Sequence, residues 1–182
     1  MIGFASNAAD RTGLATRDWI GIWTLVRRVS FTRGGGAARF RGVARVIACG
    51  PNVALYAEEG LLTIGGRTVR ATRSTWLRDE PGAVLALYFA DGEEAFDPGT
   101  ARPFVRLEAG AGGALAGTHR CGPDRYEGSY RVPGAGAIAM TWRVEGPRKA
   151  GTIRTRLLRV AWDGAAVPGE PGAGRGARGV EK

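Results

Sequence analysis

The chain has 182 residues, enough for a single domain with a sizeable hydrophobic core. It carries a net charge of +9, and all of its 26 basic residues except Lys149 and Lys182 are arginine. Two cysteines are too few for a disulfide framework, and no apolar run approaches the ~20 residues of a membrane helix. These features exclude a disulfide-stapled module and a helical membrane protein.

The two ends of the chain differ from its middle. We expect a flexible N-terminus over residues 1–15, a folded domain over residues 16–162 and a disordered Gly/Pro-rich tail over residues 163–182. Residues 1–15 lack the basic and apolar regions of a secretory signal, so a cytoplasmic protein with reduced thiols is expected. Basic and acidic residues cancel in the tail, so the folded domain carries the excess positive charge.

Segments that alternate between apolar and polar residues fill the domain, and glycine and proline clusters that form turns separate them. The alternation is cleanest near the end of the domain, where Ile138, Met140, Trp142 and Val144 share one face. Strands are predicted over residues 19–31, 38–48, 53–64, 68–77, 83–89, 103–107, 115–121, 124–132, 137–144 and 152–162. Residues 95–101 are predicted to form an inserted loop.

No long amphipathic helix interrupts these strands, so the predicted fold class is all-β. We predict a single antiparallel up-and-down β-barrel of about ten strands, because closing the sheet removes its exposed edges. A two-sheet β-sandwich is the competing architecture.

The only histidine lies in a predicted hairpin. If this hairpin turns at Gly122 and the proline after it, His119 pairs with Tyr126, and Cys121 pairs with Asp124. Side chains alternate between the two faces of a strand, so these four side chains would share one face. Four polar or reactive groups on one face, amid apolar strands, indicate the lining of a pocket.

Four motifs in chain order carry a resemblance to a known family. They are Gly21-x-Trp23-x-Leu25-x-Arg27, Tyr56-x-Glu58-x-Gly60, His119-x-Cys121-x-x-Asp124-x-Tyr126 and Trp142-x-Val144-x-Gly146-Pro147-x-Lys149. With these motifs the chain resembles the uncharacterised domain-of-unknown-function family 6314 over residues 16–162. The resemblance implies a lipocalin-like (calycin-type) β-barrel with a pocket, and no established activity comes with it.

The first motif also resembles the Gly-x-Trp signature of lipocalin-type barrels. That resemblance implies that Trp23 closes one end of the barrel and that Arg159, from the last strand, packs on it. Two positions depart from the pattern of family 6314. Val105 stands where the family tends to have a histidine, and Ala150-Gly151 stand where it often has an acidic and an aromatic residue. A mechanism that needs two histidines therefore fails for this chain.

Ten residues are candidates for binding a ligand in the pocket. They are Trp23, Arg27, Tyr56, Glu58, His119, Cys121, Asp124, Tyr126, Met140 and Trp142. The aromatic residues Trp23, Tyr56 and Trp142, together with Met140, would form the apolar lining. A polar or anionic end of the ligand would be oriented by Arg27, His119 and Tyr126.

An internal ion pair is also expected. If Arg27 and Glu58 both point inward they should pair with each other, because an unpaired buried charge is costly. Such a pair could grip a ligand carboxylate or merely tie strands together. Arg73 and Trp76, on the neighbouring strand, are further candidates for the pocket.

We predict a non-enzymatic protein that binds a small, partly apolar ligand, which can be anionic. The first alternative is an isomerase, cyclase or lyase with His119 and Tyr126 as acid–base groups, and the second is a haem-binding barrel with His119 as axial ligand. His119, Cys121 and Asp124 suit zinc, but three ligands from one hairpin make an incomplete site, so no metal and no cofactor is predicted. A structural histidine, hydrogen-bonded to Tyr126 or to a backbone carbonyl, is the remaining alternative.

The arginine content raises the question of a nucleic-acid partner, which salt-dependent retention of DNA or RNA would reveal. Here the arginines stand singly along the strands without interleaved aromatic residues, so the pattern argues against such a partner. No membrane partner is expected. The expected partner is a small molecule.

Overall fold

The structure of the chain is a computed structural model that describes residues 15–90, 92, 95–134 and 136–161. All but one residue of the expected N-terminal segment 1–15, and all of the expected tail 163–182, lie outside the described residues. The elements are α1 (Thr16–Trp19), β1 (Gly21–Arg33), β2 (Ala37–Gly50), β3 (Val53–Ile64), β4 (Arg67–Glu80), β5 (Val84–Phe89), β6 (Pro103–Ala109), the 3-10 helix η1 (Ala111–Gly113), β7 (Leu115–Cys121), β8 (Asp124–Gly134), β9 (Ala137–Glu145) and β10 (Ala150–Arg159).

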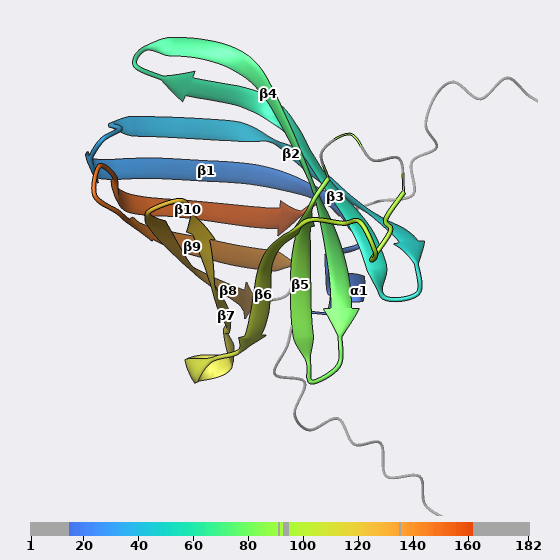
Figure 1. Cartoon of the computed structure of the whole chain (residues 1–182). Helices are drawn as coiled ribbons and strands as arrows, with labels where there is room; N and C mark the ends of the chain where they lie inside the picture. Colours follow the sequence, from blue (N-terminus) through green and yellow to red (C-terminus); the bar gives the residue numbers. More distant parts are fainter. Residues whose placement is uncertain (1–14, 91, 93–94, 135, 162–182) are drawn as a thin grey trace, which may run out of the picture.

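Each strand pairs in antiparallel fashion with its neighbours in the chain, and β10 pairs with β1 to close the barrel (Figure 1). This confirms the predicted all-β, up-and-down barrel and excludes the β-sandwich. The wall is uneven, because β1 to β4 have 12 to 14 residues whereas β5 to β7 have 6 or 7. Among the described residues, no helix is long and apolar enough to cross a membrane.

A short helix precedes β1, where a strand from Trp19 onward was predicted. Thr16 is fixed to Asp79 of β4 by two hydrogen bonds, from its backbone N to Oδ1 (2.8 Å) and from its Oγ1 to Oδ2 (2.7 Å). The backbone N of Ala15 donates to the Asp18 carboxylate (2.9 Å), which satisfies a donor at the start of the helix. These bonds hold one helical turn against the barrel, and Trp19 is 1% exposed as a result.

The Gly-x-Trp motif brings the first and last strands together. The Arg159 guanidinium lies 4.2 Å from the ring centroid of Trp23 and donates to the carbonyl oxygens of Ile20 (2.5 Å) and Asp18 (2.7 Å). A Cβ at Gly21 would lie 2.6 Å from Arg159 Nη1, and the φ of Gly21 is +130°. The glycine of the motif therefore makes room for the arginine, and the predicted contact of Arg159 with Trp23 is confirmed.

A second apolar cluster lies outside the barrel wall, on β4 and β5. The residues 95–101 were predicted to be a loop between strands, and this loop places Phe96 against the rings of Trp76 (5.9 Å) and Tyr88 (5.1 Å). Trp76 is 1% exposed under this cover. It points away from the barrel interior because its chain neighbours Thr75 and Leu77 point inward. The suggestion that Trp76 contributes to the pocket is therefore wrong.

Candidate functional site

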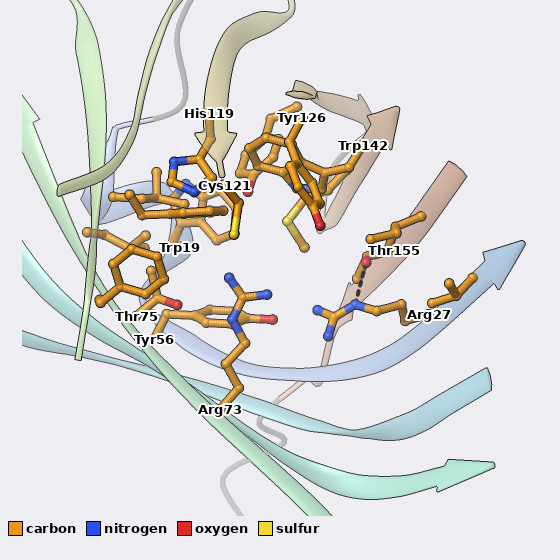
Figure 2. A pocket seen from close by; sticks show the side chains of 18 residues that line it. Trp19, Arg27, Tyr56, Arg73, Thr75, His119, Cys121, Tyr126, Trp142 and Thr155 are labelled. Atoms are coloured by element: carbon orange, nitrogen blue, oxygen red, sulfur yellow. Dashed lines mark hydrogen bonds between the residues drawn. The ribbon is translucent and has the colours of Figure 1, made fainter. Parts of the chain in front are cut away.

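A cavity of about 320 Å³ lies inside the barrel, lined by the 18 side chains drawn in Figure 2. These side chains come from α1 and from every strand except β2. Most of them are aromatic or aliphatic, and a few charged or polar groups stand among them. Both the size and this composition are typical of a pocket for a small molecule.

Aromatic rings form much of the wall. Trp19 contacts the rings of Tyr56 and Tyr130, with centroids 6.1 and 5.9 Å apart. Trp142 lies flat against the backbone of Gly128, where a Cβ would come within 2.7 Å of the indole ring. The same indole stands 6.0 Å from the Tyr130 ring, so the rings of α1, β8 and β9 form one continuous surface.

The predicted ion pair lies beside this wall. Arg27 donates through two nitrogens to the two carboxylate oxygens of Glu58 (2.7 and 2.8 Å) and through Nε to Thr155 Oγ1 (2.9 Å). The side chains are 17% and 2% exposed, so the pair is almost removed from water. Burial lowers the pKa of Arg27, but its hydrogen bond to Glu58 and the charge of Glu58 outweigh this, and the net pKa is raised. The pair expected from the sequence is confirmed.

Tyr56 completes this network. Its hydroxyl donates to Glu58 Oε2 (2.9 Å), so the carboxylate accepts three hydrogen bonds. Burial, and then the negative charge of Glu58, raise the pKa of Tyr56 well above its ordinary value. The phenol therefore stays protonated and acts as a donor, and the charge of Arg27 is already matched inside the protein.

Arg73 supplies the unmatched positive charge of the cavity. Its guanidinium points from β4 into the cavity (Figure 2), and the guanidinium carbon lies 5.6 Å from the ring centroid of Phe104. Within the described part of the chain it has no ion pair and no hydrogen bond. Burial raises the pKa of Tyr130, whereas the positive charge of Arg73 lowers it. Arg73 is an exposed residue, so it lies where the cavity is open to solvent.

The β7–β8 hairpin has the predicted register. His119 lies opposite Tyr126, and Cys121 lies opposite Asp124. Three of these residues line the cavity, but Asp124 does not. Its carboxylate lies 4.0 Å from Lys149 Nζ, because Asp124 stands at the hairpin end beside the β9–β10 turn.

Lys149 also reaches the cavity wall. Its Nζ donates to the Tyr126 hydroxyl oxygen (2.5 Å). This hydrogen bond raises the pKa of Lys149, burial lowers it, and the nearby charges raise it, with a net increase. Tyr126 is therefore held by a cation from the neighbouring turn. The sequence placed Lys149 in a family motif without predicting this contact.

His119 lies among rings rather than hydrogen-bond partners. The centroids of Phe104, Phe89 and Tyr126 are 4.7, 6.1 and 6.2 Å from the imidazole centroid. No hydrogen bond to His119 occurs among the residues that the structure describes, so the predicted structural bond to Tyr126 or a carbonyl is not seen. In the same part of the chain, no three His, Cys, Asp or Glu side chains come together in a way that could hold a metal ion.

The structure brings together most of the candidate ligand-binding residues. Those that line the cavity are Arg27, Tyr56, His119, Cys121, Tyr126, Met140 and Trp142. Glu58 lies behind Arg27, and Trp23 lies beneath Arg159 rather than in the lining. Sequence reasoning missed Trp19, Phe104 and Tyr130. Of these, Tyr130 could have been found, because it shares a strand face with Tyr126.

Residues 19–159 match a family described as a family of unknown function, DUF6314. The chain belongs to this family. No curated protein matches the DUF6314 chain at a significant level.

A solved structure is similar to this barrel in fold. An S-type phycobiliprotein lyase from Guillardia theta superposes with a TM-score of 0.58 and 9% identity, covering 84% of this chain and 96% of that chain. A redesigned β-barrel bound to DFHBI gives a TM-score of 0.41 and 11% identity, covering 80% and 98%. At 9% identity, the first likeness shows a shared β-barrel fold and nothing more.

Proposed function

We propose that this protein binds a small, partly apolar molecule with an anionic group in the barrel cavity. The observation that carries the proposal is the presence, in one cavity of about 320 Å³, of aromatic walls and the unmatched guanidinium of Arg73. The aromatic surface around Trp19 and Trp142 suits the apolar part of the ligand. A carboxylate or sulfonate can accept two parallel hydrogen bonds from a guanidinium.

The anion-binding role is given to Arg73 rather than to Arg27. Both nitrogens of Arg27 that could grip a carboxylate already donate to Glu58, and Nε donates to Thr155. A ligand anion would have to displace a buried carboxylate to reach Arg27, which is costly. Arg73 requires no such exchange. The network then acts as a rigid polar wall formed by Arg27, Glu58 and Tyr56. It ties β1 to β3, and the bond from Arg27 to Thr155 ties β1 to β10.

His119, Cys121 and Tyr126 are proposed to contact the polar end of the ligand. All three line the cavity. The imidazole of His119 makes no hydrogen bond within the described residues, whereas the Tyr126 hydroxyl is already held by Lys149. The proposal places the protein in the cytoplasm, and the free thiols of Cys49 and Cys121 are in keeping with a reducing compartment.

Two dyes test the anionic part of the proposal. Anilinonaphthalene sulfonate has an apolar ring system with a negative charge, and N-phenyl-1-naphthylamine has the same kind of ring system without one. We expect both to bind to the wild-type protein with increased fluorescence. The Arg73→Gln variant should bind the sulfonate at least about tenfold more weakly, the usual worth of a charge-assisted hydrogen bond. Its affinity for the uncharged dye should change little.

Arg70→Gln is the matched control, since Arg70 is on the same strand but on the outer face. It removes the same charge and should leave the binding of both dyes unchanged. If neither dye binds to the wild-type protein, the cavity is not a ligand site and the proposal fails. If Arg70→Gln weakens sulfonate binding as much as Arg73→Gln does, the effect comes from net charge rather than from the cavity.

The haem-binding barrel and the acid–base enzyme, the two alternatives from the sequence, stay predictions. The variant His119→Ala distinguishes both from a protein that only binds a ligand. A haem protein would show a Soret band that His119→Ala changes, and an acid–base enzyme would lose turnover in the same variant. In the function proposed here, His119→Ala lowers dye affinity modestly and gives no other change.

A further inference from the structure

Strands β2, β1 and β10 are neighbours in the barrel (Figure 1). Five arginines lie on their outer face. They are Arg28, Arg39, Arg41, Arg154 and Arg156, and we call them the basic face. All five are exposed. Their side chains point outward because their chain neighbours, such as Arg27 and Thr155, line the cavity.

The strand register places these arginines in two adjacent rows. Arg28 lies directly opposite Arg39 on one side and Arg154 on the other. In the next row Arg41 and Arg156 stand on either side of Val26. Both rows continue onto β4 and β3 on one side and onto β9 and β8 on the other. The first row adds, in this strand order, Thr68, Thr63, Thr141 and Ser129. The second row adds, in the same order, Arg70, Leu61, Ala139 and Arg131. Between β4 and β8, across β3, β2, β1, β10 and β9, neither row contains an acidic residue.

Two outward arginines elsewhere on the barrel have acidic partners. Arg45 pairs with Glu59 (2.6 Å) and Arg125 pairs with Glu127 (2.9 Å). By contrast, no ion pair or hydrogen bond involves an arginine of the basic face within the described residues. Like charges directly opposite each other on a sheet are destabilising, so the barrel would be more stable with an acid in the middle of the row. The arrangement therefore lowers stability unless an anion lies on this face.

The neighbouring like charges act on Arg39. Desolvation, and then the charges of Arg41 and Arg28, lower the pKa of Arg39. An anion on this face would relieve that repulsion.

We propose that the basic face binds the phosphate backbone of double-stranded nucleic acid without reading its sequence. Guanidinium groups bind phosphate oxygens well, and the threonines and the serine of the first row can add hydrogen bonds. The two rows offer no aromatic ring on which an unpaired base could stack, which favours a duplex over a single strand. A membrane surface fits less well, because Val26 and Leu61 are the only large apolar residues of the described rows.

This inference revises an expectation from the sequence. The arginines stand singly along the chain, which argued against a nucleic-acid partner. Pairing of β2 with β1 and of β1 with β10 brings together residues that are more than a hundred positions apart, such as Arg39 and Arg154. The cluster is independent of the cavity, so it can be tested without a cavity ligand.

The test compares two triple variants of the whole chain. Arg28→Gln/Arg39→Gln/Arg154→Gln removes the first row, and Arg17→Gln/Arg120→Gln/Arg148→Gln removes three exposed arginines from other places. Both variants lower the net charge from +9 to +6 (9 − 3). Binding of a fluorescein-labelled DNA duplex of about 20 base pairs is measured by anisotropy between about 50 and 200 mM salt.

We expect wild-type affinity to fall by about 500-fold over this salt range, as for five phosphate contacts. The row variant should bind at least tenfold more weakly at the lowest salt, with a logarithmic salt slope smaller by about three. The scattered variant should keep most of the affinity. Absence of duplex binding at low salt would overturn the proposal, as would an equal loss in both variants. Retention by phosphatidylserine vesicles in place of the duplex would assign the face to a membrane and overturn it as well.

Discussion

Glu58 and Glu59 are adjacent carboxylates with the same kind of partner and opposite surroundings. Glu58 pairs with Arg27 at 2.7 Å and its side chain is 2% exposed, whereas Glu59 pairs with Arg45 at 2.6 Å and is 58% exposed. An exposed pair is screened by water and contributes little, but a broken buried pair leaves a charge without solvent or partner. At the residue scale, burial rather than distance decides what an ion pair contributes to this barrel.

This contrast gives a prediction for two single substitutions. Glu58→Gln should lower the free energy of unfolding by about 3–5 kcal/mol, because Arg27 then lies inside the barrel without a counter-charge. Glu59→Gln should cost less than about 1 kcal/mol. Urea unfolding followed by tryptophan fluorescence measures both. Equal losses in the two variants would show that the interior pair is solvated in solution.

At the scale of the element, glycines on the inner face set how closely strands and rings approach. Gly42 and Gly60 lie opposite each other on β2 and β3, and a Cβ at either would come within 2.2 Å of a backbone oxygen of the partner strand. The two strands coil too tightly there for any side chain. On β8, Gly128 instead accommodates a ring, the indole of Trp142. Gly42 and Gly60 thus let β2 and β3 approach, and Gly128 makes room for a ring of the cavity wall.

Gly128 and Gly134 both lie on β8 in different surroundings, so they allow a matched test. Gly128→Ala should push the Trp142 indole into the cavity and lower the free energy of unfolding by about 1–3 kcal/mol, the usual cost of overpacking. It should also weaken the binding of both dyes and change the near-ultraviolet circular dichroism. Gly134→Ala, where a Cβ has nothing within 4 Å, should leave stability and binding close to wild type. If Gly128→Ala leaves dye binding unchanged, then Trp142 does not line the site where the dyes bind.

At the scale of the whole molecule, the sequence predicted what depends on local alternation and missed what depends on distant partners. The strands and the pairing of His119 with Tyr126 follow from period-two patterns and turn residues near each other in the chain. The helical turn before β1 depends on Asp79, which is 63 positions from Thr16. The burial of Trp76 depends on Phe96, and the basic face depends on three strands in register. None of these long-range contacts leaves a local signal.

Closure of the barrel is the property that belongs to the whole molecule, and Arg159 joins its two ends. The guanidinium covers Trp23 at the start of β1 and holds the carbonyls of Asp18 and Ile20, although Arg159 itself ends β10. Removing it takes away two charge-assisted hydrogen bonds and a cation–π contact at the seam between the first and last strands. Backbone carbonyls near the buried Trp19 and Trp23 would then have to find water or remain unpaired.

Arg159→Met should therefore lower the free energy of unfolding by about 2 kcal/mol or more and speed amide hydrogen exchange at the start of β1. Arg156→Met is the control on the same strand, because Arg156 points outward and has no ion pair among the described residues. That variant should be as stable as the wild type, since it loses no contact and relieves repulsion within the basic face. If the two variants unfold at the same urea concentration, the seam is held by the β1–β10 backbone ladder alone, and the arginine of the last strand only covers the tryptophan from solvent.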